Sequence, residues 1–230
     1  MRKILLMTAL LTACGNSEPI TESIVRHIPA DGIAGVVLLA KDATVTIRTA
    51  AIDVIKVDGV GETKVEIDET LRIDYGTGRL TITMPAGLRV VARVEAGNLD
   101  ISGRFGMVSL TVLKGDVRVD ADELHGGTLH AQTGNANFTT RGVPAESVTI
   151  KAPSGTADVT ISPKFRGLAQ LRAQAIDTPV DKRLAVRRSP GNATVMIGSG
   201  FTKKDHDAIP VDKRPGFWVT AKSAKLSLAD

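Results

Sequence analysis

The 230-residue sequence has few aromatic side chains, a single cysteine and no long apolar segment, and each shortage excludes a class of protein. Aromatic residues make up 3% of the chain, so neither a nucleic-acid platform nor a rich sugar-stacking surface is expected, since both need many ring faces. One cysteine cannot form an intrachain disulfide or a cysteine-based zinc site. No apolar run reaches the roughly 20 residues that a transmembrane helix needs. What remains, 43% hydrophobic and 23% charged residues, is typical of a folded domain.

The cysteine, Cys14, ends a short leader that resembles those of bacterial lipoproteins. A positive region precedes an apolar stretch, residues 4–11, that is too short to span a bilayer. In the bacterial lipobox, small residues fit a signal peptidase, and the cysteine thiol receives a diacylglycerol and becomes the new N-terminus. The residues that match the lipobox are Leu11, Thr12, Ala13 and Cys14. The leader therefore predicts a signal peptide over residues 1–13 and a membrane anchor through the lipid on Cys14. Gly15, and not an aspartate, follows the cysteine, and by resemblance to enterobacterial sorting this favours the outer membrane. The sequence leaves the leaflet open.

The rest of the chain divides into a tether and a repetitive domain. Residues 14–30 are polar and predict a tether, and residues 31–230 predict one β-domain in which residues 201–216 form an inserted loop. Short runs of alternating apolar and polar residues indicate strands throughout the domain. A glycine recurs in a fixed register between pairs of such runs, at intervals of 19, 18, 19 and 21 residues. These glycines are Gly78, Gly97, Gly115, Gly134 and Gly155, and Gly191 follows after two more units.

A period near 19 residues favours an all-β fold of one kind, a single-stranded parallel β-solenoid whose rungs stack at about 4.8 Å. We expect a right-handed coil with aliphatic core columns and a glycine at each bend. The exposed ends of such a coil need caps. Residues 31–40 are apolar enough to cap one end, and Phe217 with Trp218 can close the other. An antiparallel β-sandwich is the alternative, although it gives no reason for a glycine in fixed register.

The repeated units resemble a known family. The runs Gly78-Arg79-Leu80-Thr81-Ile82 and Gly97-Asn98-Leu99-Asp100-Ile101 are similar to units of a bacterial adhesin family of β-strand-repeat proteins of unknown function, the head-GIN auto-transporter adhesin type. The resemblance covers roughly residues 40–200. It implies a parallel β-helix, and many members carry signal or lipoprotein leaders.

Outward positions of successive rungs form ladders that are candidate sites. Three residues after each glycine, one ladder brings together Asp100, Arg118 and Asp158, with Asn137 between the last two. Carboxylates beside a basic residue suit proton removal from an acidic sugar, so a β-helix enzyme acting on acidic polysaccharide is the alternative function. A second ladder, one residue after each glycine, carries short polar side chains that we expect to bond nearby backbone groups. Its members are Asn98, Asp116, Asn135 and Thr156.

The C-terminal part of the chain is basic, with 14 basic and 7 acidic side chains over residues 151–230. The sequence Pro-Val-Asp-Lys-Arg occurs twice there, beginning at Pro179 and Pro210. If both turns project from one side, they form an anion-binding patch, because arginine pairs with carboxylate and phosphate through two hydrogen bonds. The residues of this predicted patch are Lys182, Arg183, Arg187, Arg188, Lys213 and Arg214.

Together these features predict a lipid-anchored module of the bacterial cell envelope that is adhesin-like or structural and not an enzyme. We expect its partners to be the membrane, through the lipid, and an anionic glycan, lipopolysaccharide or envelope protein. Nucleic acid is not expected as a partner of an envelope protein. No cofactor motif is present, and the four histidines lack metal-ligand spacing, so neither a cofactor nor a metal is expected. The sequence leaves the oligomeric state open.

Overall fold

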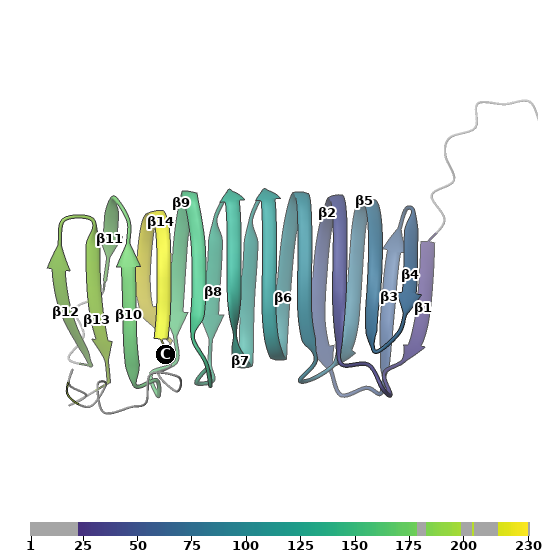
Figure 1. The fold of residues 1–230 in the computed structure, drawn as a ribbon, viewed down its shortest axis with the longest axis horizontal. Coiled ribbons are helices and arrows are strands. Elements are labelled where there is room, and N and C mark those ends of the chain that lie inside the picture. Colours follow the sequence, from purple (N-terminus) through teal and green to yellow (C-terminus); the bar gives the residue numbers. More distant parts are fainter. Residues whose placement is uncertain (1–22, 179–182, 199–203, 205–215, 230) are drawn as a thin grey trace, which may run out of the picture.

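A computed structural model describes residues 23–178, 183–198, 204 and 216–229, and within them fourteen strands form one long, curled sheet (Figure 1). The all-β class is therefore confirmed. The strands are β1 (Ser23–Pro29), β2 (Gly35–Ala50), β3 (Val54–Val60), β4 (Thr63–Ile67), β5 (Thr70–Pro85), β6 (Arg89–Lys114), β7 (Val117–Thr133), β8 (Ala136–Thr140), β9 (Val148–Ile161), β10 (Gly167–Arg172), β11 (Ala175–Asp177), β12 (Leu184–Ser189), β13 (Asn192–Ile197) and β14 (Gly216–Leu228). Strand β1 occupies part of the predicted tether. Among the described residues, no helix is long and apolar enough to cross a membrane.

Strands in the middle of the sheet pair in parallel, with the offset that the glycine repeat predicts. Along the sheet the order is β1-β3-β5-β2-β6-β7-β8-β9-β14-β10-β13-β12. Leu99 of β6 pairs with Val117 of β7, and Val117 pairs with Ala136 of β8. Ala136 in turn pairs with Ala157 of β9. Each of these four residues follows its repeat glycine by two positions, so the interval between successive glycines is also the offset between neighbouring strands in this region.

The prediction of a wholly parallel coil is not confirmed, because the sheet is mixed and open. At one end β1, β3 and β5 pair antiparallel, as do β4 and β5, and at the other end β10, β13 and β12 pair antiparallel. Two of these pairs, β4 with β5 and β12 with β13, are hairpins joined by two residues, a connection too short for a parallel crossover. Gly191, expected to continue the glycine register, instead lies in the turn between β12 and β13 with φ of 69°.

The positions of β2 and β14 in the sheet correct both of the expected caps. Strand β2 lies between β5 and β6, so residues 35–40 are in the parallel region and do not cap an end. Strand β14, yellow in Figure 1, lies between β9 and β10, so Phe217 and Trp218 do not close an end either. Phe217 is buried in the core, whereas Trp218 is 39% exposed. Adjacent residues of a strand point to opposite faces, so only one of the two rings can be in the core.

The glycines of the repeat allow neighbouring bends to stack closely. A Cβ atom on Gly115 would lie 1.9 Å from the carbonyl oxygen of Gly97, and one on Gly134 would lie 2.0 Å from that of Gly115. Gly115 and Gly134 also have φ of 128° and 149°, which side chains rarely adopt. Ala43 of β2 pairs with both Gly78 and Gly97, so an alanine takes one place in this column. Any larger residue at Gly115 would force the bends apart.

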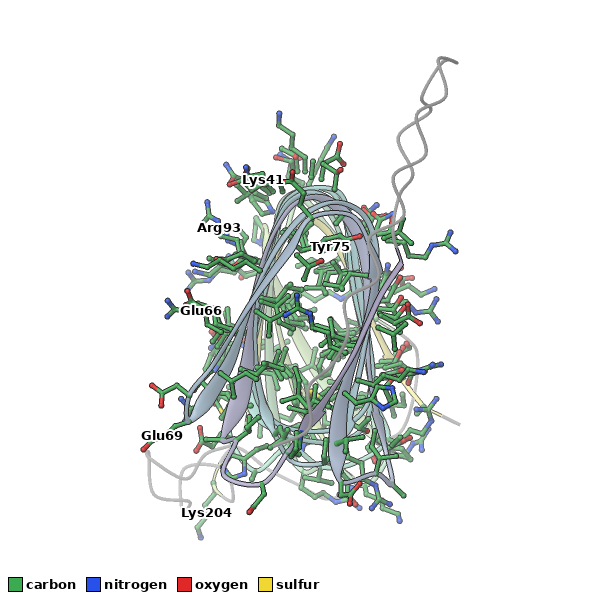
Figure 2. The ribbon with its side chains drawn as sticks, turned by 90° about the vertical axis from the view of Figure 1, so that its right-hand side faces the viewer. Lys41, Glu66, Glu69, Tyr75, Arg93 and Lys204 are labelled. Atoms are coloured by element: carbon green, nitrogen blue, oxygen red, sulfur yellow. The ribbon has the colours of Figure 1, made fainter. Side chains whose placement is uncertain are left out.

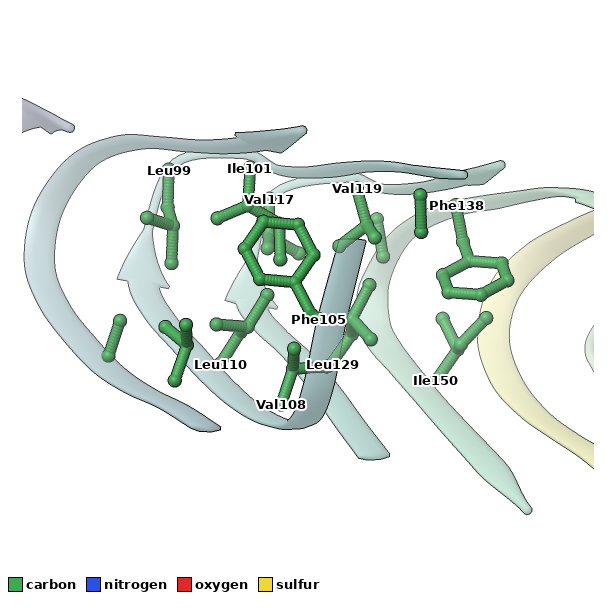
Figure 3. Close-up of a cluster of buried hydrophobic side chains, with 14 of the residues drawn as sticks. Leu99, Ile101, Phe105, Val108, Leu110, Val117, Val119, Leu129, Phe138 and Ile150 are labelled. Atoms are coloured by element: carbon green, nitrogen blue, oxygen red, sulfur yellow. The ribbon is translucent and has the colours of Figure 1, made fainter. Parts of the chain in front are cut away.

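The core lies between the two sides of the curled sheet and consists of stacked apolar columns. Figure 3 shows Leu99, Val117 and Val119 on one side, facing Leu110 and Leu129 on the other. These side chains are buried, as the alternating pattern predicts. Toward the C-terminal end the columns include rings: Phe217 lies 5.1 Å from Phe165 and 5.7 Å from Phe138, between centroids.

Candidate binding surfaces

The predicted lipidation site and half of the predicted anion-binding patch lie outside the described residues. Those residues are Leu11, Thr12, Ala13, Cys14, Lys182, Lys213 and Arg214. Arg187 and Arg188 lie on β12, the outermost strand of the C-terminal end, and Arg183 directly precedes it. The guanidinium of Arg188 donates hydrogen bonds to the carbonyl oxygen of Ile176 and to the hydroxyl of Thr178. Arg188 therefore joins β12 to the segment that contains β11, a structural role.

The Asp100, Arg118 and Asp158 ladder forms as the repeat predicts. Asp100 pairs with Arg118, Arg118 with Asn137, and Asn137 with Asp158 across four neighbouring strands. Three strand spacings separate the two aspartates, about 14 Å between backbones. The carboxyl pairs of glycosidases lie about 5–9.5 Å apart, so these two aspartates do not share one sugar bond. Over the described residues, no group of three His, Cys, Asp or Glu side chains is placed to hold a metal.

The second ladder bonds backbone groups, as expected, and it does so between neighbouring strands. The Asn98 side-chain oxygen accepts from the Asp116 backbone N–H at 3.1 Å. The Asp116 carboxylate accepts from the Asn135 backbone N–H at 2.7 Å and from the Asn135 side-chain amide at 3.1 Å. The Asn135 oxygen then accepts from the Thr156 backbone N–H at 3.0 Å. These residues therefore stabilise the stacked bends and are not free for a ligand.

A hollow of about 780 Å³ lies over β2, β4, β5 and β6. Lys64, Asp74, Leu39 and Arg93 are successive register partners across these four strands. The residues that line the hollow are Leu39, Ala40, Lys41, Glu62, Thr63, Lys64, Asp74, Tyr75, Gly76, Arg93 and Glu95. Figure 2 shows Lys41 and Arg93 at the outer surface and Tyr75 inside the curled sheet.

Charges of both signs surround this hollow. The Lys64 ammonium lies 2.6 Å from the Glu66 carboxylate, and this hydrogen-bonded pair raises the pKa of Lys64 and lowers the pKa of Glu66. Oδ1 of Asp74 is buried and has no hydrogen-bond partner. Leu39 is 45% exposed beside Asp74, so the floor of the hollow presents an apolar side chain to solvent. The arrangement can accept a ligand that has an apolar part and polar groups on either side.

Tyr75 has a structural role in the wall of the hollow. Its hydroxyl lies 2.6 Å from the carbonyl oxygen of Val60 and 2.8 Å from that of Arg79, to which its one proton can be donated. Burial raises the pKa of Tyr75, with the Val60 hydrogen bond acting in the opposite direction. The hydroxyl therefore fixes β3 against the bend of β5.

Reasoning from the sequence missed this hollow because its strands are not consecutive. Strand β2 separates β5 from β6, although residues 54–67 intervene between β2 and β5 in the chain. The regular interval between Gly78 and Gly97 implies that β5 and β6 are neighbours. One signal was available: Leu39 follows Leu38 in a strand, so one of the two must face outward.

Comparisons with known proteins do not assign the chain to a family. No family model matches the sequence, and no curated protein matches it. Its fold is similar to that in the crystal structure of a "putative cell adhesion protein" from Clostridium sporogenes, with a TM-score of 0.46 and 10% sequence identity, over 90% of this chain and 99% of that chain. The resemblance to the adhesin family of β-strand-repeat proteins stays a prediction.

Proposed function

We propose that this protein is a lipid-anchored module of the bacterial cell envelope that binds an envelope component without catalysing a reaction. The observation that carries the binding role is the hollow beside Leu39. Its volume, about 780 Å³, is within the range of ligand sites, and it combines an exposed apolar side chain with charged side chains. Lipopolysaccharide fits this combination, because it has acyl chains and anionic groups that Arg93 and Lys41 can pair with.

The anchor rests on the leader that ends at Cys14. Diacylation of this cysteine would hold the protein on a membrane, since two acyl chains give stable attachment. Gly15 after the cysteine supports the outer membrane. The described domain begins at Ser23, so the short segment 15–22 joins the lipidated cysteine to β1.

The parallel strands support a β-solenoid for the middle of the domain, and right-handed is the usual hand for connections between parallel strands. Strands there follow each other at the intervals of the glycine repeat, and each long strand bends so that its two halves contribute to the two sides of the sheet. A parallel stack of this kind presents the same face over many strands, which suits recognition of an extended polymer or a membrane surface.

Fractionation of cells that express the full chain with its leader tests the anchor. Wild-type protein is expected in the membrane fraction and to incorporate an alkyne-labelled fatty acid. Cys14→Ser is expected in the soluble fraction without label, whereas the control Ser17→Ala stays membrane-bound and labelled. Retention of Cys14→Ser on the membrane would refute the anchor.

Binding of purified lipopolysaccharide to the detergent-solubilised full chain tests the hollow. Leu39→Asp and Arg93→Gln are each expected to weaken binding at least fivefold, because they remove the apolar floor and one cation. Arg118→Gln, on β7 outside the hollow, is the matched control and is expected to bind like wild type. Equal affinity of all four proteins, or no binding by any, would refute a lipopolysaccharide site in this hollow.

A further inference from the structure

The indole of Trp218 is exposed on the outer face of β14. Its neighbours in the strand, Phe217 and Val219, are buried, so the strand alternates and Trp218 points away from the core. Strand β14 lies between β9 and β10, which places the ring within the sheet and away from its ends. Gly216 lies beneath the indole, since a Cβ atom added there would be in van der Waals contact with two atoms of the six-membered ring, at 3.6 Å. The exposed part of the indole offers a large apolar face that a partner from outside the chain can cover.

Two cations flank this ring on the neighbouring strands. Trp218 pairs with Thr149 of β9 and Gln170 of β10, and two residues further Thr220 pairs with Lys151 and Arg172. Lys151 and Arg172 are therefore two strand spacings apart, about 10 Å between backbones. Neither forms an ion pair with an acidic side chain of the described residues. Their charges are available to an anion from outside the chain.

These residues line a groove of about 310 Å³, which we call the Trp218 groove. Its lining residues are Thr149, Lys151, Gln170, Arg172, Trp218, Val219 and Thr220. The groove combines one ring face, two cations, and hydroxyl and amide groups that can donate or accept hydrogen bonds. Its volume suits one or two sugar rings at the lower limit of ligand sites.

We propose that the Trp218 groove binds an acidic oligosaccharide containing uronate residues. The polarised C–H groups on one face of a pyranose ring pack against the electron-rich face of the indole. A uronate carboxylate pairs with Arg172 through two hydrogen bonds or with the Lys151 ammonium. Gln170, Thr149 and Thr220 bond the sugar hydroxyls. Charge complementarity favours this occupant over a neutral glycan, which leaves both cations without a partner.

The groove is separate from the predicted Asp100, Arg118 and Asp158 ladder. Figure 3 places Val117 and Val119 on one side of the core and Ile150 on the other, so Arg118 and Lys151 belong to opposite sides of the sheet. The inference rests on the proposed non-enzymatic binding role and names the ligand class of a second surface. It needs no contribution from the hollow beside Leu39.

Tryptophan fluorescence tests the proposal directly, since Trp218 is the single tryptophan of the chain. The full chain is titrated with a tetramer of galacturonate, with maltotetraose as the neutral control. Galacturonate is expected to change the emission with saturation and to protect the ring from acrylamide quenching, and maltotetraose is expected to bind at least tenfold more weakly. Raising the salt concentration is expected to weaken galacturonate binding.

Calorimetry on variants assigns the binding to residues. Trp218→Ala and the double variant Lys151→Gln/Arg172→Gln are each expected to raise the Kd at least tenfold. Trp218→Phe is expected to raise the Kd less, and Arg118→Gln is expected to leave it unchanged. Thermal melting shows whether each variant folds. Unchanged affinity of Trp218→Ala, equal binding of the two sugars, or absence of a fluorescence change would refute the proposal. Lipopolysaccharide binding that depends on Leu39 would persist in that case, so the proposed function would stand.

Discussion

From β6 to β9 each strand follows the last at a nearly constant interval and pairs in parallel, whereas at both ends of the sheet the strands pair antiparallel and include a hairpin, β4 with β5 and β12 with β13. The middle is held by repeated features: the glycine column and the ladder of Asn98, Asp116 and Asn135. The antiparallel C-terminal end depends on individual features, such as the Arg188 hydrogen bonds. This difference shows that a sequence repeat predicts strand pairing only in the part of a fold where the order of strands in the sheet follows their order in the chain.

A substitution in the glycine column is expected to disrupt the parallel middle of the sheet and to cause the largest loss of stability. Gly115→Ala is expected to lower the free energy of unfolding by about 4 kcal/mol or more, because its Cβ would lie 1.9 Å from the Gly97 carbonyl oxygen at a φ of 128°. The control is Gly87→Ala, at a turn with φ of 83° and nothing within 4 Å of the added atom. It is expected to cost about 1–2 kcal/mol. Equal losses in urea denaturation would show that close stacking is not what glycine provides.

Removal of the Phe217 ring tests the packing between the parallel middle and the C-terminal end, because β14 lies between β9 and β10. Phe217→Ala is expected to lower the free energy of unfolding by about 3–5 kcal/mol, since it leaves a cavity between Phe138 and Phe165. Phe217→Leu fills most of that space and is expected to cost less than half as much. The measurement is urea denaturation combined with hydrogen exchange. Exchange is expected to increase in β10 and β14 before β6 and β7, and uniform exchange would mean that the end and the middle unfold as one unit.

The parallel middle could be predicted from sequence because two independent patterns agree there. Apolar residues alternate, and a glycine recurs at Gly97, Gly115 and Gly134, so both strand content and strand offset follow. Alternation alone does not give direction: Ala193, Val195 and Ile197 alternate like any parallel strand, yet β13 runs antiparallel to β10. The long-range insertions of β2 and β14 leave no trace in the period.

The candidate sites were harder to predict for the same reason. The hollow beside Leu39 and the Trp218 groove both form where an inserted strand brings distant segments together. A sequence search for charge clusters finds the repeated Pro-Val-Asp-Lys-Arg turns. It cannot find the pair Lys151 and Arg172, because neither is part of a charged run and only the folded sheet places them on either side of β14. The outward orientation of Trp218 could have been inferred from the alternation of side chains along a strand, because its neighbour Phe217 faces the core.

The polar ladder offers a graded test of the middle, with the smallest expected effect. Asp116→Ala removes the acceptor of two hydrogen bonds from Asn135 and is expected to lower the free energy of unfolding by about 1–2 kcal/mol. Asn98→Ala removes the acceptor of one hydrogen bond, from the Asp116 backbone N–H, and is expected to cost about 1 kcal/mol. Asp116→Asn keeps a side-chain oxygen in place and is the matched control, with little expected change. If Asp116→Asn costs as much as Asp116→Ala, the negative charge and not the hydrogen bond stabilises the bend, and the ladder would then lose its stabilising effect in high salt.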